Sequence, residues 1–138
     1  MSLVDPTGRL ITEIRDDTGE ARVRGGEPAA GDALGPGRYQ RFVVIVRLAR
    51  TRLKRAPIQE VTYAARCYGV THQDAAALAG EVSDAVHSRG HRITPGGLSI
   101  FGSFDDGGGG SAVDPDTGQP YEVVLISVGA LDRVLPMA

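Results

Sequence analysis

Basic side chains gather in the middle of this 138-residue chain, where they form a cluster with potential for binding. One interpretation is a solvated hairpin tip, whose charges keep strand edges from pairing with other chains. Another is a surface that binds an acidic partner or the phosphates of a nucleic acid. No aromatic side chain is interleaved with the cluster, so stacking on single-stranded bases is not supported. The cluster consists of Arg47, Arg50, Arg52, Lys54 and Arg55.

A second candidate is an acidic, glycine-rich stretch further along the chain. Its Asp-x-Asp-x-Gly pattern partly resembles a calcium-binding loop, but Gln119 stands where that loop needs glycine and Leu125 where it needs glutamate. Aspartate and proline at this spacing predict a turn instead. The four glycines before it lack the lysine and hydroxyl residue of a phosphate-binding loop. The carboxylates of this stretch are Asp105, Asp106, Asp114 and Asp116.

The remaining chemistry-bearing residues form no catalytic or metal-binding pattern. His87 and His91 are four residues apart, but Gly90 is expected to end the helix between them, and no glutamate adjoins His87 as in a metalloprotease. Cys67, the single cysteine, is predicted to be a small core residue. Paired carboxylates occur only at Asp16-Asp17 and in the acidic stretch, where solvated positions are expected. We therefore predict no catalytic residues, no metal site and no cofactor.

The element that positions these residues is a strand followed directly by a helix. From Ile58 to Gly69 the pattern alternates with period two, as in a strand. Thr71 is predicted to cap a helix that ends before Gly90, and Asp74 places negative charge near the positive end of its dipole. One apolar stripe with helical spacing follows: Ala75, Leu78, Ala79, Val82 and Val86.

The rest of the chain supplies one more helix and three more strands. Asp5-Pro6 is a helix start, and Thr18-Gly19 is its expected end. A brief extended piece at 21–24 and an irregular loop at 25–37 follow. The remaining predicted elements are strands at 42–49, 98–104 and 121–130, a polar loop at 105–120 and a tail at 131–138.

These elements predict an α+β fold, a mostly antiparallel four-stranded sheet with helices packed on one face. The strands form two hairpins, 42–68 and 98–130; the first has a short link, and neighbouring strands with short links usually pair. We expect one domain over 1–138, in which 1–40 form a helix and loop, 41–130 the sheet and helix core, and 131–138 the tail.

Composition and charge exclude several classes of protein. The net charge of -2 does not fit a polycation that binds nucleic acid throughout. One cysteine allows no internal disulfide. The first residues lack the pattern of a signal peptide, and no apolar run reaches the ~20 residues of a membrane span. A soluble protein made in a cytoplasm, without a membrane partner, is expected.

Two segments of the chain look familiar when taken together. The first is RAPIQEVTYAARCYGVT at 55–71 with its alanine-rich helix, and the second is GGGGSAVDPDTGQPYE at 107–122 before the last strand. In this order and spacing they resemble the tail terminator, or tail completion, proteins of long-tailed bacteriophages, especially those that infect actinobacteria with GC-rich genomes. The resemblance covers 41–130 and is a pattern of segments without a catalytic signature.

The resemblance implies a structural virion protein, not an enzyme. It implies six copies in a ring on the head-proximal end of the tail tube, in the neck region, after assembly in the bacterial cytoplasm. The implied partners are further copies of the chain, the major tail tube protein and a head-neck connector protein, with DNA passing through the lumen. Opposite charges on the basic cluster and the acidic stretch fit subunit or tube contacts. Alternatives are another neck or head-tail connector protein, or a small nucleic-acid-binding module.

Overall fold

The structure is a computed structural model that describes residues 5–52, 58–88, 98–104 and 111–131. For residues 52, 58, 87–88, 98–104 and 131 only the backbone is described. The elements in chain order are α1 (Thr7–Thr18), β1 (Val23–Gly25), β2 (Phe42–Arg52), β3 (Ile58–Tyr68), α2 (His72–Ser88), β4 (Leu98–Phe104), β5 (Ala112–Val113) and β6 (Pro120–Leu131).

The strands form one sheet in the order β1-β2-β3-β6-β4, and β5 pairs with β6 beside this path. The predicted hairpin of β2 and β3 is confirmed, with Phe42 opposite Tyr68 and Arg52 opposite Gln59. β4 and β6 are antiparallel neighbours, as predicted, and β6 lies between β4 and β3. The second half of the chain therefore inserts its long strand next to the first hairpin.

The prediction of a four-stranded sheet was incomplete in three ways. β1 adds a strand that runs parallel to β2, which makes the sheet mixed. β5 lies within the segment 105–120 that was expected to be a loop. Leu131, expected to begin a tail, is the last residue of β6 and pairs with Ile58. β1 overlaps the brief extended piece predicted at 21–24, but its three residues are too few for an alternating pattern that would assign it to the sheet, and β5 has only two.

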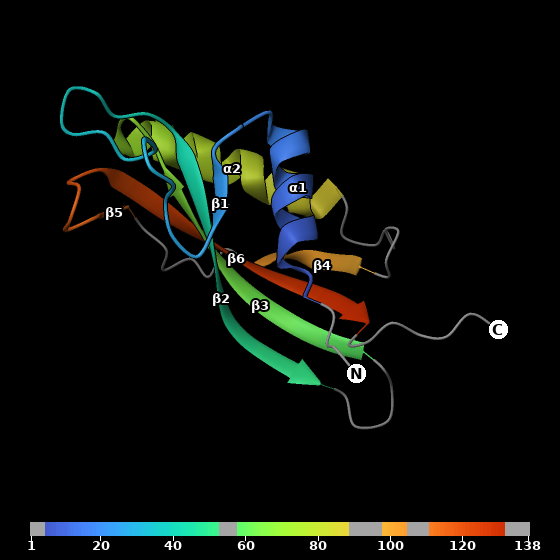
Figure 1. The fold of residues 1–138 in the computed structure, drawn as a ribbon. Helices are drawn as coiled ribbons and strands as arrows, with labels where there is room; N and C mark the ends of the chain where they lie inside the picture. Colours follow the sequence, from blue (N-terminus) through green and yellow to red (C-terminus); the bar gives the residue numbers. More distant parts are fainter. Residues whose placement is uncertain (1–4, 53–57, 89–97, 105–110, 132–138) are drawn as a thin grey trace.

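Both helices lie on the same face of the sheet, as predicted (Figure 1). The main core forms between this helical layer and alternate residues of β2, β3 and β6, together with Val23 of β1. Leu78 and Val82 of the predicted apolar stripe are fully buried in it. Cys67 is buried in the same core, as predicted, and burial raises the pKa of its thiol to about 12. The helix-free face carries a smaller apolar cluster around Phe42, Val44 and Tyr68.

Local signals mark the helix ends, with one difference from the prediction. α1 begins at Thr7 with Pro6 as its N-cap residue, so Asp5, predicted to be the cap, stands one residue before it, although its Oδ1 accepts a hydrogen bond from the backbone N–H of Thr7 at 3.0 Å. α1 ends at Gly19, which adopts the left-handed conformation with φ 71°. The hydroxyl of Thr71 accepts a hydrogen bond from the N–H of Asp74 at 3.1 Å, as a helix N-cap does. The position of Gly90 lies outside the described residues.

Among the described residues, no helix combines the length and the apolar character that crossing a bilayer requires.

Candidate functional site

The described part of the basic cluster lies along the second half of β2, from Arg47 opposite Tyr63 to Arg52 opposite Gln59. Arg47 and Arg50 are exposed on β2, beyond the part of this strand that β1 covers. The backbone of Arg52 ends β2, while Lys54 and Arg55 lie outside the described residues. Among the described residues, no strand pairs with the outer side of this part of β2, so these arginines lie along a strand edge.

The start of α1 lies near this basic edge. The pKa of Asp5 is lowered first by hydrogen bonds from the hydroxyl and the N–H of Thr7, and further by Arg47 and Arg50. The Thr7 hydroxyl also forms a hydrogen bond with the Tyr63 hydroxyl at 2.9 Å. Part of the positive charge on β2 is therefore balanced within the subunit, and the exposed guanidinium groups remain accessible to a partner.

Asp114 belongs to a compact turn that ties β6 to β3. Its Oδ1 accepts a hydrogen bond from the N–H of Asp116 at 2.8 Å, and its Oδ2 accepts one from the Tyr68 hydroxyl at 2.8 Å. Burial opposes ionisation of Asp114, but these hydrogen bonds favour its charged form, and its pKa lies below the ordinary value. Asp114 therefore holds the turn together, whereas Asp116 is exposed and available for contacts.

Gln119 anchors the same turn from inside. Its fully buried side chain donates from Nε2 to the carbonyl oxygens of Gln40 at 2.6 Å and Gly69 at 3.1 Å. The N–H of Gly69 in turn donates to the carbonyl oxygen of Pro120 at 3.1 Å. The 107–122 segment is thus hydrogen-bonded to the junction between β3 and α2. In the sequence, Gln119 stands out only as a mismatch to a calcium loop, because its bonding partners come from distant segments.

The predicted basic and acidic surfaces lie apart on the sheet. Arg50 and Arg47 lie opposite Val61 and Tyr63 of β3, whereas the Asp114 turn is attached at Tyr68. The seven and five residue steps between them correspond to about 23 and 17 Å along the strand. These surfaces therefore do not meet within one subunit. Asp105 and Asp106 lie outside the described residues.

Aromatic rings cover one end of the helix-free face. Phe42 and Tyr68 stack with ring centroids 4.2 Å apart, and the Tyr121 ring lies 5.2 Å from Tyr68. The Arg66 guanidinium lies 6.0 Å from the centre of the Tyr121 ring. Burial of Tyr68 raises its pKa to about 12, with the neighbouring Asp114 acting in the same direction. Since Phe42 and Tyr68 are buried, these two rings are packing groups rather than a platform for bases.

Arg41 forms an ion-pair network that the sequence analysis missed. Its guanidinium contacts Asp74 Oδ1 at 2.6 Å and Glu81 Oε2 at 3.0 Å. The pKa of Asp74 is lowered by the hydrogen bond from Arg41, against the effect of burial, with a further contribution from the Val70 N–H. Asp74 and Glu81 are two helical turns apart, which predicts a shared face, but no local pattern predicts Arg41 as their partner.

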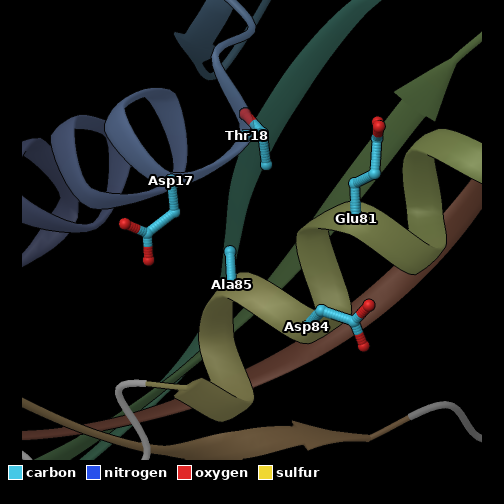
Figure 2. A pocket seen from close by; sticks show the side chains of 5 residues that line it. All are labelled: Asp17, Thr18, Glu81, Asp84 and Ala85. Carbon is cyan, nitrogen blue, oxygen red and sulfur yellow. The ribbon is translucent and has the colours of Figure 1, made fainter.

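An acidic hollow of about 410 Å³ separates the end of α1 from α2. Figure 2 shows that the carboxylates of Asp17, Glu81 and Asp84 point in different directions and do not converge on one centre. In the part of the chain that the structure describes, no group of side chains is arranged to hold a metal ion. A smaller hollow of about 240 Å³ lies between residues 33–36 and the turn at Asp116 and Thr117.

Comparison of the chain with models of protein families and with curated proteins finds no match.

Proposed function

We propose that this protein is a structural virion protein of a long-tailed bacteriophage. Copies of the chain form a ring on the head-proximal end of the tail tube, end its polymerisation and join the tail to the neck of the head. The contacts of the ring are with the major tail tube protein on one side and a head-neck connector protein on the other, and DNA passes through the lumen. The proposal begins from the resemblance of the segments 55–71 and 107–122 to tail terminator proteins.

One observation carries the proposal furthest: the two family-like segments form a single structural unit. Tyr68 and Gly69 of the first segment are hydrogen-bonded to Asp114, Gln119 and Pro120 of the second. Two segments about forty residues apart thus share one set of contacts. The two segments therefore resemble one family as parts of the same local structure. A joint resemblance of this kind supports the proposal better than two matches in unconnected parts of the fold.

The distribution of charge also supports a ring. Subunits in a ring contact each other head to tail, through two different surfaces of the same chain. The exposed Arg47 and Arg50 lie in the second half of β2, and the exposed Asp116 lies in the turn that is bonded to the far end of β3 at Tyr68. Since these groups are too far apart to neutralise each other in one subunit, their charges are available to neighbouring subunits or to the tube.

The experiment uses a phage that lacks the gene for this protein. We expect over-long tails that are not joined to heads in electron micrographs, and complementation with the wild-type protein restores normal particles. Arg50→Glu should complement poorly, whereas Arg38→Glu, the same charge change at an exposed loop position, should complement well. Both variants should fold, since exposed charges contribute little to stability. Tails of normal length joined to heads in the deletion would refute the proposal.

The exposed arginines of β2 also favour a second candidate, a nucleic-acid-binding module. Binding to generic DNA across a series of salt concentrations separates the two. Contacts with phosphates give an affinity that falls steeply with salt. A steep slope that Arg50→Glu flattens would favour the module, and binding that is absent at all salt concentrations would exclude it. A different neck or head-tail connector protein is distinguished by normal tail length with unjoined heads in the deletion.

A further inference from the structure

The two outer strands of the sheet each leave an edge without a partner among the described residues. β1 pairs only with Val43–Ile45, so β2 is unpaired on its outer side from Val46 to Arg52. At the other side of the sheet β4 is the last strand. Unpaired edges present free N–H and C=O groups, which are a template for pairing with another chain.

The two free edges lie at the same level of the sheet. Both segments have seven residues, 46–52 and 98–104. The strand pairings lead straight across the sheet from one segment to the other. The matching positions are Arg52, Gln59, Ala130 and Leu98 at one end and Val46, Ala64, Leu125 and Phe104 at the other. At the opposite end of the sheet β1 covers β2, and β5 pairs with β6.

The directions of these strands fit a ring. β2, β3, β6 and β4 are successively antiparallel, so β4 runs opposite to β2. Copies related by rotation about an axis along the strands keep the same orientation. When two such copies stand side by side, β4 of one lies antiparallel to β2 of the next. Antiparallel strands in this arrangement form a regular hydrogen-bond ladder.

The two edges differ in how they are protected. β2 carries the exposed Arg47 and Arg50, and an irregularity in its pairing falls at Leu48. Like charges of this kind discourage β2 from pairing with a second β2. The β4 sequence, LSIFGSF, contains no charged residue and no proline. An uncharged edge strand tends to pair with another chain unless it is covered. On β2, the edge proposed to receive it, the exposed Leu48 offers apolar surface.

From these observations we propose that β4 of one copy pairs with the free half of β2 of the next, which joins the sheets of neighbouring subunits into one continuous sheet. The pairing rests on the ring of the proposed function and defines its subunit contact. Each subunit then contributes four long strands, β2, β3, β6 and β4, to a closed surface. The helices stay on one face of that surface, because both pack on the same side of the sheet (Figure 1).

Disulfide trapping tests the pairing in the full-length protein. Thr51 and Ser99 lie at the same level of the sheet through Glu60 and Gly129, so Thr51→Cys combined with Ser99→Cys is the test pair. The control pair is Thr51→Cys with Val113→Cys, because Val113 is exposed at the covered end of the sheet. The native Cys67 is fully buried and does not compete.

We expect the test pair to yield disulfide-linked ladders in concentrated protein under mild oxidation, and the control pair and both single variants to yield none. The strands of a closed sheet are shifted in register relative to each other. Thr51→Cys is therefore also combined with Ile100→Cys and with Ser103→Cys, and a ladder from any of these pairs supports the proposal. A dimer from Ser99→Cys alone would show β4 pairing with β4 and would overturn it. Oligomers by native mass spectrometry without any such ladder would overturn it too, while leaving a ring intact.

A backbone test separates edge pairing from charge. The Val43 N–H donates to Arg22 on the outer side of β2, so Val43 and Cys67, which lie opposite each other, do not bond to each other. β3 alternates from Cys67 to Val61 without a register shift, so Val61 and its partner Arg50 are likewise a pair without mutual hydrogen bonds, and the Arg50 N–H points away from β3. Arg50→Pro removes this outward donor, and Arg50→Ala keeps it. We expect only the proline variant to raise the concentration for half-assembly by about tenfold, as one backbone hydrogen bond warrants. Equal assembly of the two variants, with unchanged circular dichroism, would refute the pairing. Normal phage tails despite the β2–β4 ladder would refute only the phage function.

Discussion

Gly69 lies where β3 ends and the chain turns into α2, and this position has no room for a side chain. A Cβ at Gly69 would lie 2.2 Å from the backbone nitrogen of Ala75 and 2.6 Å from its Cα. Carbon atoms in contact lie about 3.5–4.0 Å apart. The obstructing atoms are backbone atoms in the first turn of α2, and this helix is held to the sheet by the buried Leu78 and Val82.

We therefore expect Gly69→Ala to lower the free energy of unfolding by about 3 kcal/mol, the upper end of the usual cost of overpacking. Gly80→Ala adds the same methyl group at an exposed position in α2, where no atom lies within 4 Å. Alanine is the better helix residue, so this control should raise the free energy of unfolding by about 0.5–1 kcal/mol. Urea denaturation of both variants and the wild type measures the difference. A Gly69→Ala variant within about 0.5 kcal/mol of the wild type would show that the close approach is wrong.

Two further predictions concern the contacts of α2. Leu78→Ala should lower the free energy of unfolding by ~2–5 kcal/mol, as for buried leucines. The control Val113→Ala, at a side chain that is 51% exposed, should change the free energy of unfolding by less than about 0.5 kcal/mol. Similar values for both variants would contradict the assigned core. The pKa of Asp74 is lowered from its ordinary value of 3.8 in the folded state, so its stabilising effect is complete above that pH and is lost as pH falls further. The difference in unfolding free energy between the wild type and Asp74→Asn should therefore shrink on acidification below about pH 4, and a difference that is constant with pH would refute the ion pair with Arg41.

Local chemistry explains which elements were predicted correctly. The alternation around Tyr63 and the helical stripe through Leu78 depend only on which residues neighbour each other along the chain. The Thr71 cap and the Gly19 helix end are likewise decided within one helical turn. Such features can be predicted from the sequence without knowledge of the fold, because their energies come from groups a few residues apart.

The parts of the candidate site that were missed depend on contacts over long distances. Arg41 binds Asp74 and Glu81, which follow it by 33 and 40 residues. Gln119 bonds to carbonyl groups 79 and 50 residues before it. A surface arginine and a polar turn residue look the same in a sequence whether or not such partners exist. Asp114 illustrates the consequence, because it was expected on a projecting loop and instead holds the turn to Tyr68.

The sequence alone determined the α+β class, the two helices and the four long strands. The tertiary structure decided the order in which the strands pair, with β6 between β3 and β4 and β1 parallel to β2. The physical reason is that an alternating pattern states which face of a strand is buried but not which strand lies beside it. Several strand orders bury the same faces, and only the packing of the whole chain selects one. The two free edges, which follow from that order, are therefore a property of the fold.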